Sequence, residues 1–372
     1  MRRHFERIVC LLACSVALSG LSACTTAGYY WQSVSGHLQL MQAARPIDHW
    51  LQDPQTPPEV KDRLALASRI RSFAVAQLAL PDNPSYLRYA DLQRSAAVWN
   101  VVAAPALSLE LRQWCFPVAG CVSYKGYFDP AQAREEAERL QAEGLETHVH
   151  AVPAYSTLGW LNWAGGDPLL NTFIGYPEGE LARLIFHELA HQVVYVSGDT
   201  AFNESFATAV ERLGGRLWLA RQASARTRQE FAAHDQRRQQ FRALALNLRR
   251  QLELIYDSRS EQALQAPEAN RQVRKEAAMN DFRSRYAELR AGWGGYAGYD
   301  RWVAGVNNAS LGALAEYDDL APGFEALFDL KNGQWAHFYE SVRQLGELPR
   351  AERHDRLLQL AVSRAHPGNQ AK

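Results

Sequence analysis

Two consecutive segments near the middle of the chain carry apolar residues at helical spacing. The first runs from Pro177 to Val196, and Gly198 suits the end of a helix. Its apolar residues follow the pattern i, i+3, i+4 and i+8, namely Leu181, Leu184, Ile185 and Leu189. The second segment begins near Asp199 or Thr200, which are both favourable N-caps. Its apolar positions are Phe206, Val210, Leu213 and Leu217. The pattern therefore predicts two helices joined by a short loop.

Strand-like segments precede these two helices. Residues 98–102 are rich in β-favouring side chains, and residues 145–152 form a second such run. Residues 118–128 could add a third strand. Between them, Asp129 is placed to cap a helix that has Pro130 at its first position. We therefore expect a small sheet beside the central helices.

Residues 221–290 have a different composition, rich in Arg, Gln, Ala and Glu. Their apolar residues keep helical spacing, at Phe231, Phe241, Leu244, Leu248, Leu252 and Ile255. They predict a long helical hairpin that turns between about Ser258 and Asn270. This arm is either a solvated structural element or one that binds a partner, not yet identified, or gates substrate. With helical patterns also in residues 37–80 and 291–365, the expected fold class is α+β, mainly α.

The first central helix contains an H-E-x-x-H motif, His187-Glu188-Leu189-Ala190-His191. Residues i and i+4 lie on one helix face, so both histidines can bind one zinc ion. Glu188 lies about 100° around the helix, where it can take a proton from an attacking water. Glu204 in the next helix can supply the third ligand of a catalytic zinc site. The predicted ligands are therefore His187, His191 and Glu204, with Glu188 as the base.

The motif alone also occurs by chance, as two polar residues on a solvated helix face. The helical context and the nearby Glu204 favour the zinc site. Asp199 and Asn203 are candidates for orienting the ligands, although Asp199 could also be only a helix cap. His148 and His150 alternate on a predicted strand and lack acidic companions, so we interpret them as ordinary strand residues.

Several long blocks of the chain resemble the bacterial putative aminopeptidase family of predicted lipoproteins. The blocks are residues 114–122, 126–128, 154–160, 167–172, 180–192 and 198–208. The resemblance implies a zincin-like metallopeptidase core of the gluzincin type, with a small sheet over the active helix and peptides as substrates. Two features depart from better-known gluzincins. Glu204 follows His191 sooner than is usual there, and no G-x-M-E-N segment, which recognises the substrate amine, occurs in the chain.

A peptidase of this type needs a donor for the oxyanion that forms during peptide hydrolysis. Tyr155 lies in a block just before the metal helix, and Tyr317 lies in a C-terminal segment that also resembles the family. Both are candidate donors, and either could instead be a buried structural tyrosine.

The N-terminus resembles a lipoprotein signal peptide. Basic residues are followed by the apolar stretch 8–20, which is too short to span a membrane stably, and then by Leu21-Ser22-Ala23-Cys24. This sequence resembles a lipobox in which Cys24 is lipidated; the alternative is an ordinary secretory peptide with an incidental cysteine. Because Thr25 is not the aspartate of an inner-membrane retention signal, we expect the periplasmic face of an outer membrane.

Cys115 and Cys121 remain as a pair once the signal peptide, with Cys10 and Cys14, is removed. Disulfides persist in exported proteins, and the short loop with Pro117 and Gly120 allows a bridge. A second metal site is the alternative, but it lacks further Cys or His partners.

Composition limits the functional classes. The chain has 40 basic and 40 acidic residues; removing residues 1–23 takes away three basic and one acidic residue, which leaves 37 and 39. A nearly neutral protein lacks the basic surface typical of nucleic-acid binding. The predicted organisation is a signal peptide (1–23), a tether (24–36), a metallopeptidase core (37–220), the arm (221–290) and a C-terminal helical part of the core (291–365).

Three functions are compatible with these features. The first is zinc-dependent hydrolysis of peptides, as an aminopeptidase on short peptides or as an endopeptidase, by a lipid-anchored envelope protein. The second is a zinc site retained for structure or binding, which the presence of Glu188 disfavours, because a structural site needs no base. The third is an envelope scaffold whose arm is the working part.

Overall fold

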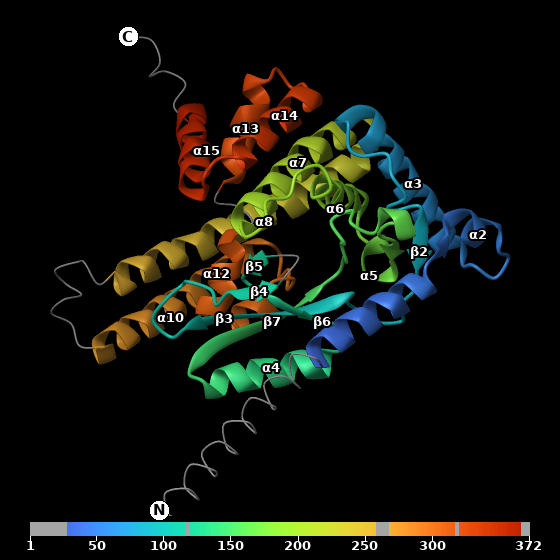
Figure 1. The fold of residues 1–372 in the computed structure, drawn as a ribbon. Helices are drawn as coiled ribbons and strands as arrows, with labels where there is room; N and C mark the ends of the chain where they lie inside the picture. Colours follow the sequence, from blue (N-terminus) through green and yellow to red (C-terminus); the bar gives the residue numbers. More distant parts are fainter. Residues whose placement is uncertain (1–27, 117–119, 258–267, 317–319, 366–372) are drawn as a thin grey trace, which may run out of the picture.

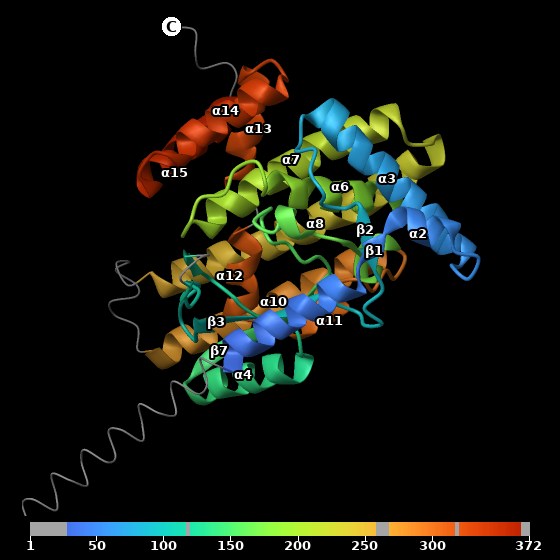
Figure 2. The ribbon, with the colours of Figure 1, turned by 45° about the vertical axis from the view of Figure 1, so that its right-hand side comes forward.

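The computed structural model describes residues 28–116, 120–257, 268–316 and 320–365. These residues are mainly helical, and their strands form small sheets, which confirms the predicted α+β class. Helices α6 (Glu178–Ala190) and α7 (Thr200–Arg221) lie side by side at the centre (Figures 1 and 2). Helix α3 (Pro58–Leu78) packs against both, after the short α2 (Ile47–Gln52). Gly214 permits this close approach, since a Cβ there would lie 2.6 Å from Leu78 and 2.9 Å from Phe186.

The first central helix is shorter than the apolar pattern predicts. Helix α6 ends at Ala190 rather than near Val196, and Gly198, with φ of 78°, lies in the turn before α7. The segment from Val193 to Val196 contains β-branched residues, which are weak helix formers. The side chain of Asn203 accepts a hydrogen bond from the backbone N–H of Val196 and donates one to the carbonyl oxygen of Val196, both at 2.8 Å. These two bonds hold the loop against α7.

The largest contribution of strands is a three-stranded antiparallel sheet. Strand β3 (Val98–Pro105) lies between β6 (Lys125–Tyr127) and β7 (Leu145–Val152). Helix α4 (Pro130–Ala142), capped by Asp129 as predicted, covers the outer face of this sheet. The other face packs in part on α12 (Asn308–Glu316), and in part it lines a cavity that is also lined by residues of α6 and α7. The two predicted strands 98–102 and 145–152 are both present.

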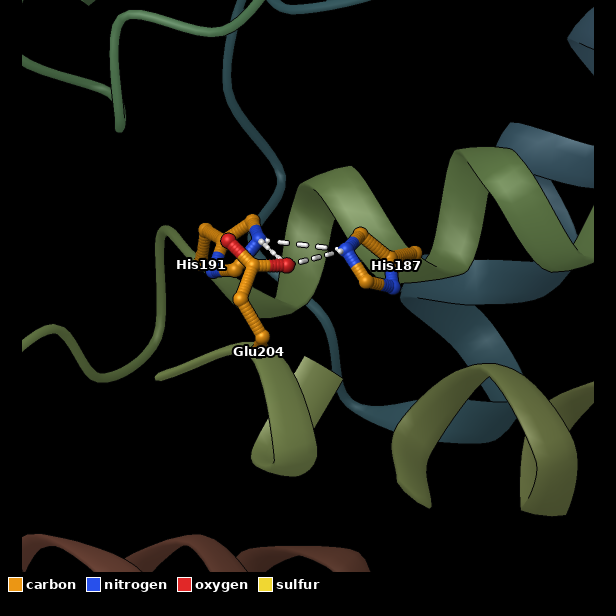
Figure 3. A group of neighbouring side chains, drawn as sticks. All are labelled: His187, His191 and Glu204. Atoms are coloured by element: carbon orange, nitrogen blue, oxygen red, sulfur yellow. Dashed lines mark hydrogen bonds and ion pairs between the residues drawn. The ribbon is translucent and has the colours of Figure 1, made fainter. Parts of the chain in front are cut away.

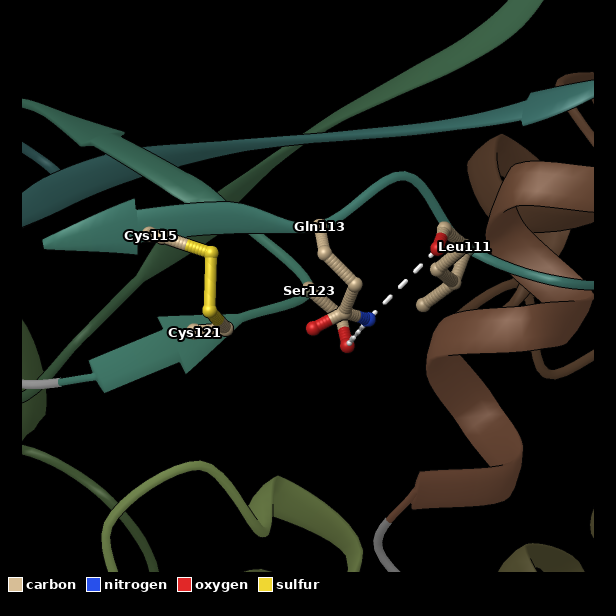
Figure 4. Close-up of a disulfide and its surroundings, with 5 residues drawn as sticks. All are labelled: Leu111, Gln113, Cys115, Cys121 and Ser123. Carbon is tan, nitrogen blue, oxygen red and sulfur yellow. Dashed lines mark hydrogen bonds between the residues drawn. A yellow bond between two sulfur atoms is a disulfide. The ribbon is translucent and has the colours of Figure 1, made fainter.

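Two smaller sheets complete the strand content of the described residues. One joins β1 (Arg45–Pro46), β2 (Arg88–Ala90) and β8 (Leu169–Leu170), and is followed by the short α5 (Asn171–Ile174). The other is a hairpin of β4 (Trp114–Phe116) and β5 (Gly120–Val122), closed by a disulfide between Cys115 and Cys121 (Figure 4). Beside the hairpin, the amide of Gln113 donates a hydrogen bond to Ser123 at 2.7 Å.

The segment expected as a tether, residues 24–36, is helical from residue 28, within a helix that spans residues 28–43. This helix is held on the body of the protein. The Gln32 amide accepts a hydrogen bond from the backbone N–H of Phe128 at 3.1 Å, and Gly36 packs directly on the Phe128 ring. The tether prediction is therefore wrong for these residues, because small and polar side chains on one face of the helix allow close packing.

The arm consists of α8 (Ala225–Tyr256) and α10 (Glu268–Gly292), which lie side by side. Most of the predicted turn, residues 258–267, lies outside the described residues. The arm has its own apolar cluster, shared with α11 (Asp300–Ala304) and α12 (Asn308–Glu316). The first half of α8 packs against α6, where Phe231 contacts Gly179. This half is therefore part of the protein body rather than a solvated extension.

The chain ends in three helices that pack near the start of α7: α13 (Ala321–Leu330), α14 (Trp335–Gly346) and α15 (Arg350–Ala365). Phe206 of α7 contacts Phe324 and Phe338 in this group. Within the described part of the chain, we find no helix that is both long and apolar enough to cross a membrane.

Candidate metal centre

The three predicted ligands come together at the contact of α6 and α7. His187 and His191 project from one face of α6, and Glu204 reaches them from the second turn of α7 (Figure 3). The two Nε2 atoms of the histidines are 3.2 Å apart. The Glu204 Oε2 lies 3.3 Å from His187 Nε2 and 3.8 Å from His191 Nε2. Among the described residues, these three form the cluster of His, Cys, Asp and Glu side chains able to hold a metal ion.

This geometry fits a zinc ion. Zinc binds His nitrogens and carboxylate oxygens at about 2.0–2.2 Å in a tetrahedral arrangement, which places neighbouring ligand atoms about 3.3–3.6 Å apart. The observed separations of 3.2 to 3.8 Å are of this size. Three ligands also leave one tetrahedral position for water or substrate.

A second carboxylate fixes the orientation of His187. Its Nδ1 lies 3.1 Å from Oε2 of Glu211, which stands two turns after Glu204 on α7. A proton on Nδ1 leaves the lone pair of Nε2 facing the other two ligands, as metal-binding histidines require. Arg183, one turn before His187, pairs with the other oxygen of Glu211. Glu211 and Arg183 were not predicted from the sequence.

The carboxylates of Glu204 and Glu211 favour a positive charge at the position where the three ligands meet. Burial lowers the pKa of His187, but Glu204 and Glu211 together raise it well above the ordinary value. Burial also lowers the pKa of His191, to about 4, so this imidazole is neutral at pH 7. Burial raises the pKa of Glu204, but the charges of His191 and His187 and the hydrogen bond with His187 lower it overall. His191 and Glu204 are therefore in the neutral and ionised forms that bind metal, while the carboxylates around His187 favour a positive charge there, which either a proton or a metal ion can supply.

Glu188 lines the same cavity as the three ligands. Burial raises its pKa to about 7, with a further increase from the charges of Glu204 and Asp167 and a decrease from His187. A carboxylate that exchanges its proton near neutral pH is suited to general acid–base catalysis.

Asp199 and Asn203 support the helices that carry the ligands. Asp199 caps α7 through the N–H of Phe202, and its fully buried carboxylate pairs with Arg353 at 2.7 Å and His354 at 2.9 Å, both on α15. The contacts of Asn203 described above hold the loop between α6 and α7. Asn203 therefore bonds to the backbone of the loop, and Asp199 bonds to the first turn of α7 and to α15. Asp199 is in the position of a helix cap.

The ligands lie in a cavity of about 1390 Å³ whose lining has two chemically different parts. We call the first the aromatic wall; it comes from the helix of residues 28–43, from β4 and from loops beside the sheet. Its members are Tyr29, Tyr30, Phe116, Phe128, Tyr155 and Trp160. We call the second the ionic wall; it comes from α6, α7, α8 and α13. Its members are Arg183, Glu211, Arg212, Asp235, Arg238 and Glu325.

Tyr155 lies in the aromatic wall, where its ring packs against Phe128 and His37 at centroid distances of 5.3 and 5.7 Å. Tyr195, in the loop between α6 and α7, also lines the cavity and was missed by sequence reasoning. Burial and the charge of Glu204 raise the pKa of Tyr195, so its hydroxyl stays protonated at neutral pH. The other predicted donor, Tyr317, and the predicted lipidation site, Cys24, lie outside the described residues.

His148 and His150 share one face of β7, as predicted, with their rings stacked at 5.7 Å. Burial lowers the pKa of both, to about 4 for His150. They are thus neutral strand residues, and β7 pairs them with Val102 and Asn100 of β3.

Comparison with known proteins identifies the family. The family model described as "Putative aminopeptidase" matches residues 28–357, which is most of the chain. The chain therefore belongs to this family. Comparisons with curated proteins and with solved structures gave no match.

Proposed function

We propose that this member of the putative aminopeptidase family is a zinc-dependent peptidase of the gluzincin type, with a zincin-like core. The observation that carries the proposal is the convergence of His187, His191 and Glu204, at 3.2 to 3.8 Å, beside Glu188 in one cavity. A structural metal site would need neither a base such as Glu188 beside the metal nor an adjoining cavity of about 1390 Å³.

When bound, zinc supplies positive charge that polarises a peptide carbonyl and makes water more acidic. Glu188 takes the proton of the attacking water and passes it to the leaving amine. Its pKa of about 7 suits both steps. Glu211 holds His187 in the tautomer that keeps Nε2 available.

We propose that Tyr195 donates a hydrogen bond to the developing oxyanion, with Tyr155 as the alternative donor. Both line the cavity. Tyr195 is preferred because it lies four residues after His191, in the loop that joins the two helices carrying the ligands. A donor at this point would act where negative charge forms during the reaction.

The substrates that we propose are short peptides with free N-termini. The substrate ammonium needs a carboxylate partner, because an unpaired buried charge is costly. Asp167 and Asp199 are both buried and already bonded, Asp167 to Thr157 and Asp199 to Arg353. Asp235 and Glu325 of the ionic wall also pair with arginines, Asp235 with Arg238 and Glu325 with Arg364, but unlike Asp167 and Asp199 they line the cavity, where a substrate ammonium can reach them.

We also propose that the protein is exported and anchored through a lipid on Cys24, on the periplasmic face of an outer membrane. This rests on the lipobox-like sequence before Cys24. The disulfide between Cys115 and Cys121 is compatible with an oxidising compartment.

Metal content and hydrolysis test the proposed chemistry separately. His187→Ala and Glu204→Ala should each reduce bound zinc sharply, while Glu188→Gln should retain zinc and lose hydrolysis by several orders of magnitude. Glu230→Gln, at an exposed position of α8, is the matched control and should behave as wild type. Stoichiometric zinc in both ligand variants, or full activity of Glu188→Gln on the best peptide, would refute the proposal.

A further inference from the structure

The helix of residues 28–43 exposes several large apolar side chains, while its buried side includes a glutamine and a glycine. Tyr30, Trp31, Val34 and Leu38 are 42, 74, 54 and 51% exposed. Trp31, Val34 and Leu38 follow i, i+3 and i+7, so they lie on one face of the helix. The buried side carries Gln32 and Gly36 together with Leu40 and Ala44. The usual amphipathic arrangement, with polar residues outward, is therefore inverted in the first half of this helix.

The exposure is not a result of loose attachment. Gln32 bonds to Phe128 and Gly36 contacts the Phe128 ring, as described above. At the other end of the helix, Arg88 donates hydrogen bonds to the carbonyl oxygens of Met41 and Ala44, at 2.9 and 2.5 Å. The helix is thus fixed at both ends with its apolar face outward.

Charge is absent from this part of the chain. The sequence contains no Asp, Glu, Lys or Arg between Arg7 and Arg45. A surface helix in contact only with water usually carries charged residues on its outer face. An exposed helix face without charged residues is typical of a surface that becomes buried in an apolar environment. Trp and Tyr are the side chains enriched where a protein contacts the surface of a bilayer.

The position of this helix, directly after Cys24, indicates that the apolar environment is a lipid bilayer. Only residues 25–27 separate Gly28 from Cys24, the proposed lipid anchor. The four residue steps from Cys24 to Gly28 span at most about 14 Å when the chain is fully extended. A lipid on Cys24 would therefore hold the beginning of this helix within that distance of the bilayer surface.

Two more exposed tryptophans lie near the other end of the helix. Trp160 and Trp163 are 53 and 84% exposed, on the loop that contains the short helix Asn162–Ala164. Gly165 of this loop packs against Arg88, the residue that bonds to Met41 and Ala44. Exposed aromatic side chains therefore occur beside both ends of the helix.

We propose that the face formed by Tyr30, Trp31, Val34 and Leu38 docks on the surface of a phospholipid bilayer. This inference rests on one part of the proposed function, the lipid anchor at Cys24, because that anchor would bring the face to a membrane. Docking would fix the orientation of the protein, and since Tyr30 also lines the cavity, it would hold one side of the cavity beside the membrane.

The test uses the chain of residues 24–372 with Cys24→Ser, so that no lipid contributes. Its partition onto sedimenting vesicles of phosphatidylcholine is measured with and without the substitutions Trp31→Ser, Val34→Ser and Leu38→Ser. Burial of one large apolar side chain corresponds to about a tenfold change in partition or more. We expect the triple variant to bind at least tenfold more weakly, and 0.5 M NaCl to leave binding unchanged because the face carries no charge.

The matched control removes three exposed apolar side chains elsewhere, with Leu254→Ser, Val273→Ser and Val362→Ser. It should partition as wild type does. Equal partition of wild type and triple variant, no partition by either, or release by salt would each overturn the inference. A concentration-dependent dimer that is lost in the triple variant, without vesicle binding, would assign the face to a second copy of the chain instead.

Zinc content and hydrolysis of a soluble peptide are measured on the same samples. The triple variant should retain both, since none of its substituted residues lines the cavity. If the triple variant no longer binds vesicles but keeps its zinc and its hydrolysis, the docking face is supported independently of the catalytic site. Absence of zinc or hydrolysis from a wild type that still partitions would refute the proposed function and leave docking in place.

Discussion

The two walls of the cavity are built by different means. The aromatic wall is held by ring packing and by the close contact between Gly36 and Phe128. The ionic wall is a chain of charges, in which Glu211 pairs with Arg183, Arg183 with Asp235, and Asp235 with Arg238. The ionic wall reaches a proposed metal ligand through the contact of Glu211 with His187. The comparison indicates that the aromatic wall shapes the space for substrate, whereas the ionic wall also tunes the metal centre.

The largest expected effect concerns the oxyanion donor, which we place outside both walls, at Tyr195 in the loop between α6 and α7. Tyr195→Phe should lower kcat by about 10² to 10³, the usual effect of removing one such donor. Tyr155→Phe, in the aromatic wall, should lower kcat less than tenfold, because packing of its ring is retained. Steady-state kinetics on one peptide, with zinc content as a control, measures both. A larger loss for Tyr155→Phe would give the aromatic wall a chemical role and reverse the assignment.

The link between the ionic wall and the metal can be broken at Glu211. Glu211→Gln removes the carboxylate that pairs with His187, and should weaken zinc binding by about 10- to 100-fold. Asp235→Asn is the control, since it removes a different partner of Arg183 and leaves the contact of Glu211 with His187 in place. Competition with a chromogenic chelator gives both affinities. Equal affinities in the two variants would mean that Glu211 has no special relation to the metal.

A smaller effect is expected where the ionic wall joins the arm to α6. Burial raises the pKa of Glu180, but His234 and the charges of Arg238 and Arg183 lower it to about 2. A lowered pKa stabilises the folded state above the ordinary value of about 4.5, and this stabilisation is lost as the pH falls toward 2. We expect Glu180→Gln to reduce the free energy of unfolding by about 2 kcal/mol at pH 7 and to have little effect near pH 2.

Denaturant unfolding at pH 7, 5 and 3, with a chelator present throughout, measures this dependence without a contribution from metal release. Glu230→Gln again serves as the control, because Glu230 pairs with Arg226 at an exposed position of α8. A wild type and a Glu180→Gln variant with parallel pH profiles would show that the contact between arm and α6 does not depend on this carboxylate.

Local signals in the sequence were sufficient for the metal-binding motif and for the start of one further helix. The spacing of His187 and His191 places both on one helix face, and the Asp129-Pro130 pair marks the start of α4. Glu211 was missed, although it lies seven residues after Glu204 and so on the same face of α7. That spacing is the signal which could have identified it.

Contacts between distant segments were not predictable in the same way. The pairing of Arg238 with Glu180 joins residues 58 positions apart, and helical periodicity does not specify which surface a helix packs on. The role of residues 28–43 was missed because their exposed side chains are apolar while the packed ones include Gln32 and Gly36. A pattern that assumes apolar residues inside therefore gives the wrong orientation for this helix.

The ion pair of Asp199 with Arg353 and His354 has a consequence for the order of assembly during synthesis. The two sides of this contact are 154 and 155 positions apart, and the Asp199 carboxylate is fully buried in the folded protein. Removing one partner of a buried pair typically costs about 3–5 kcal/mol. The start of α7, which carries Glu204, therefore reaches its final stability only after the last helix has left the ribosome and folded. A nascent chain that already contains every residue of the metal centre is still incomplete, and loss of the C-terminal helix would affect the site from a distance.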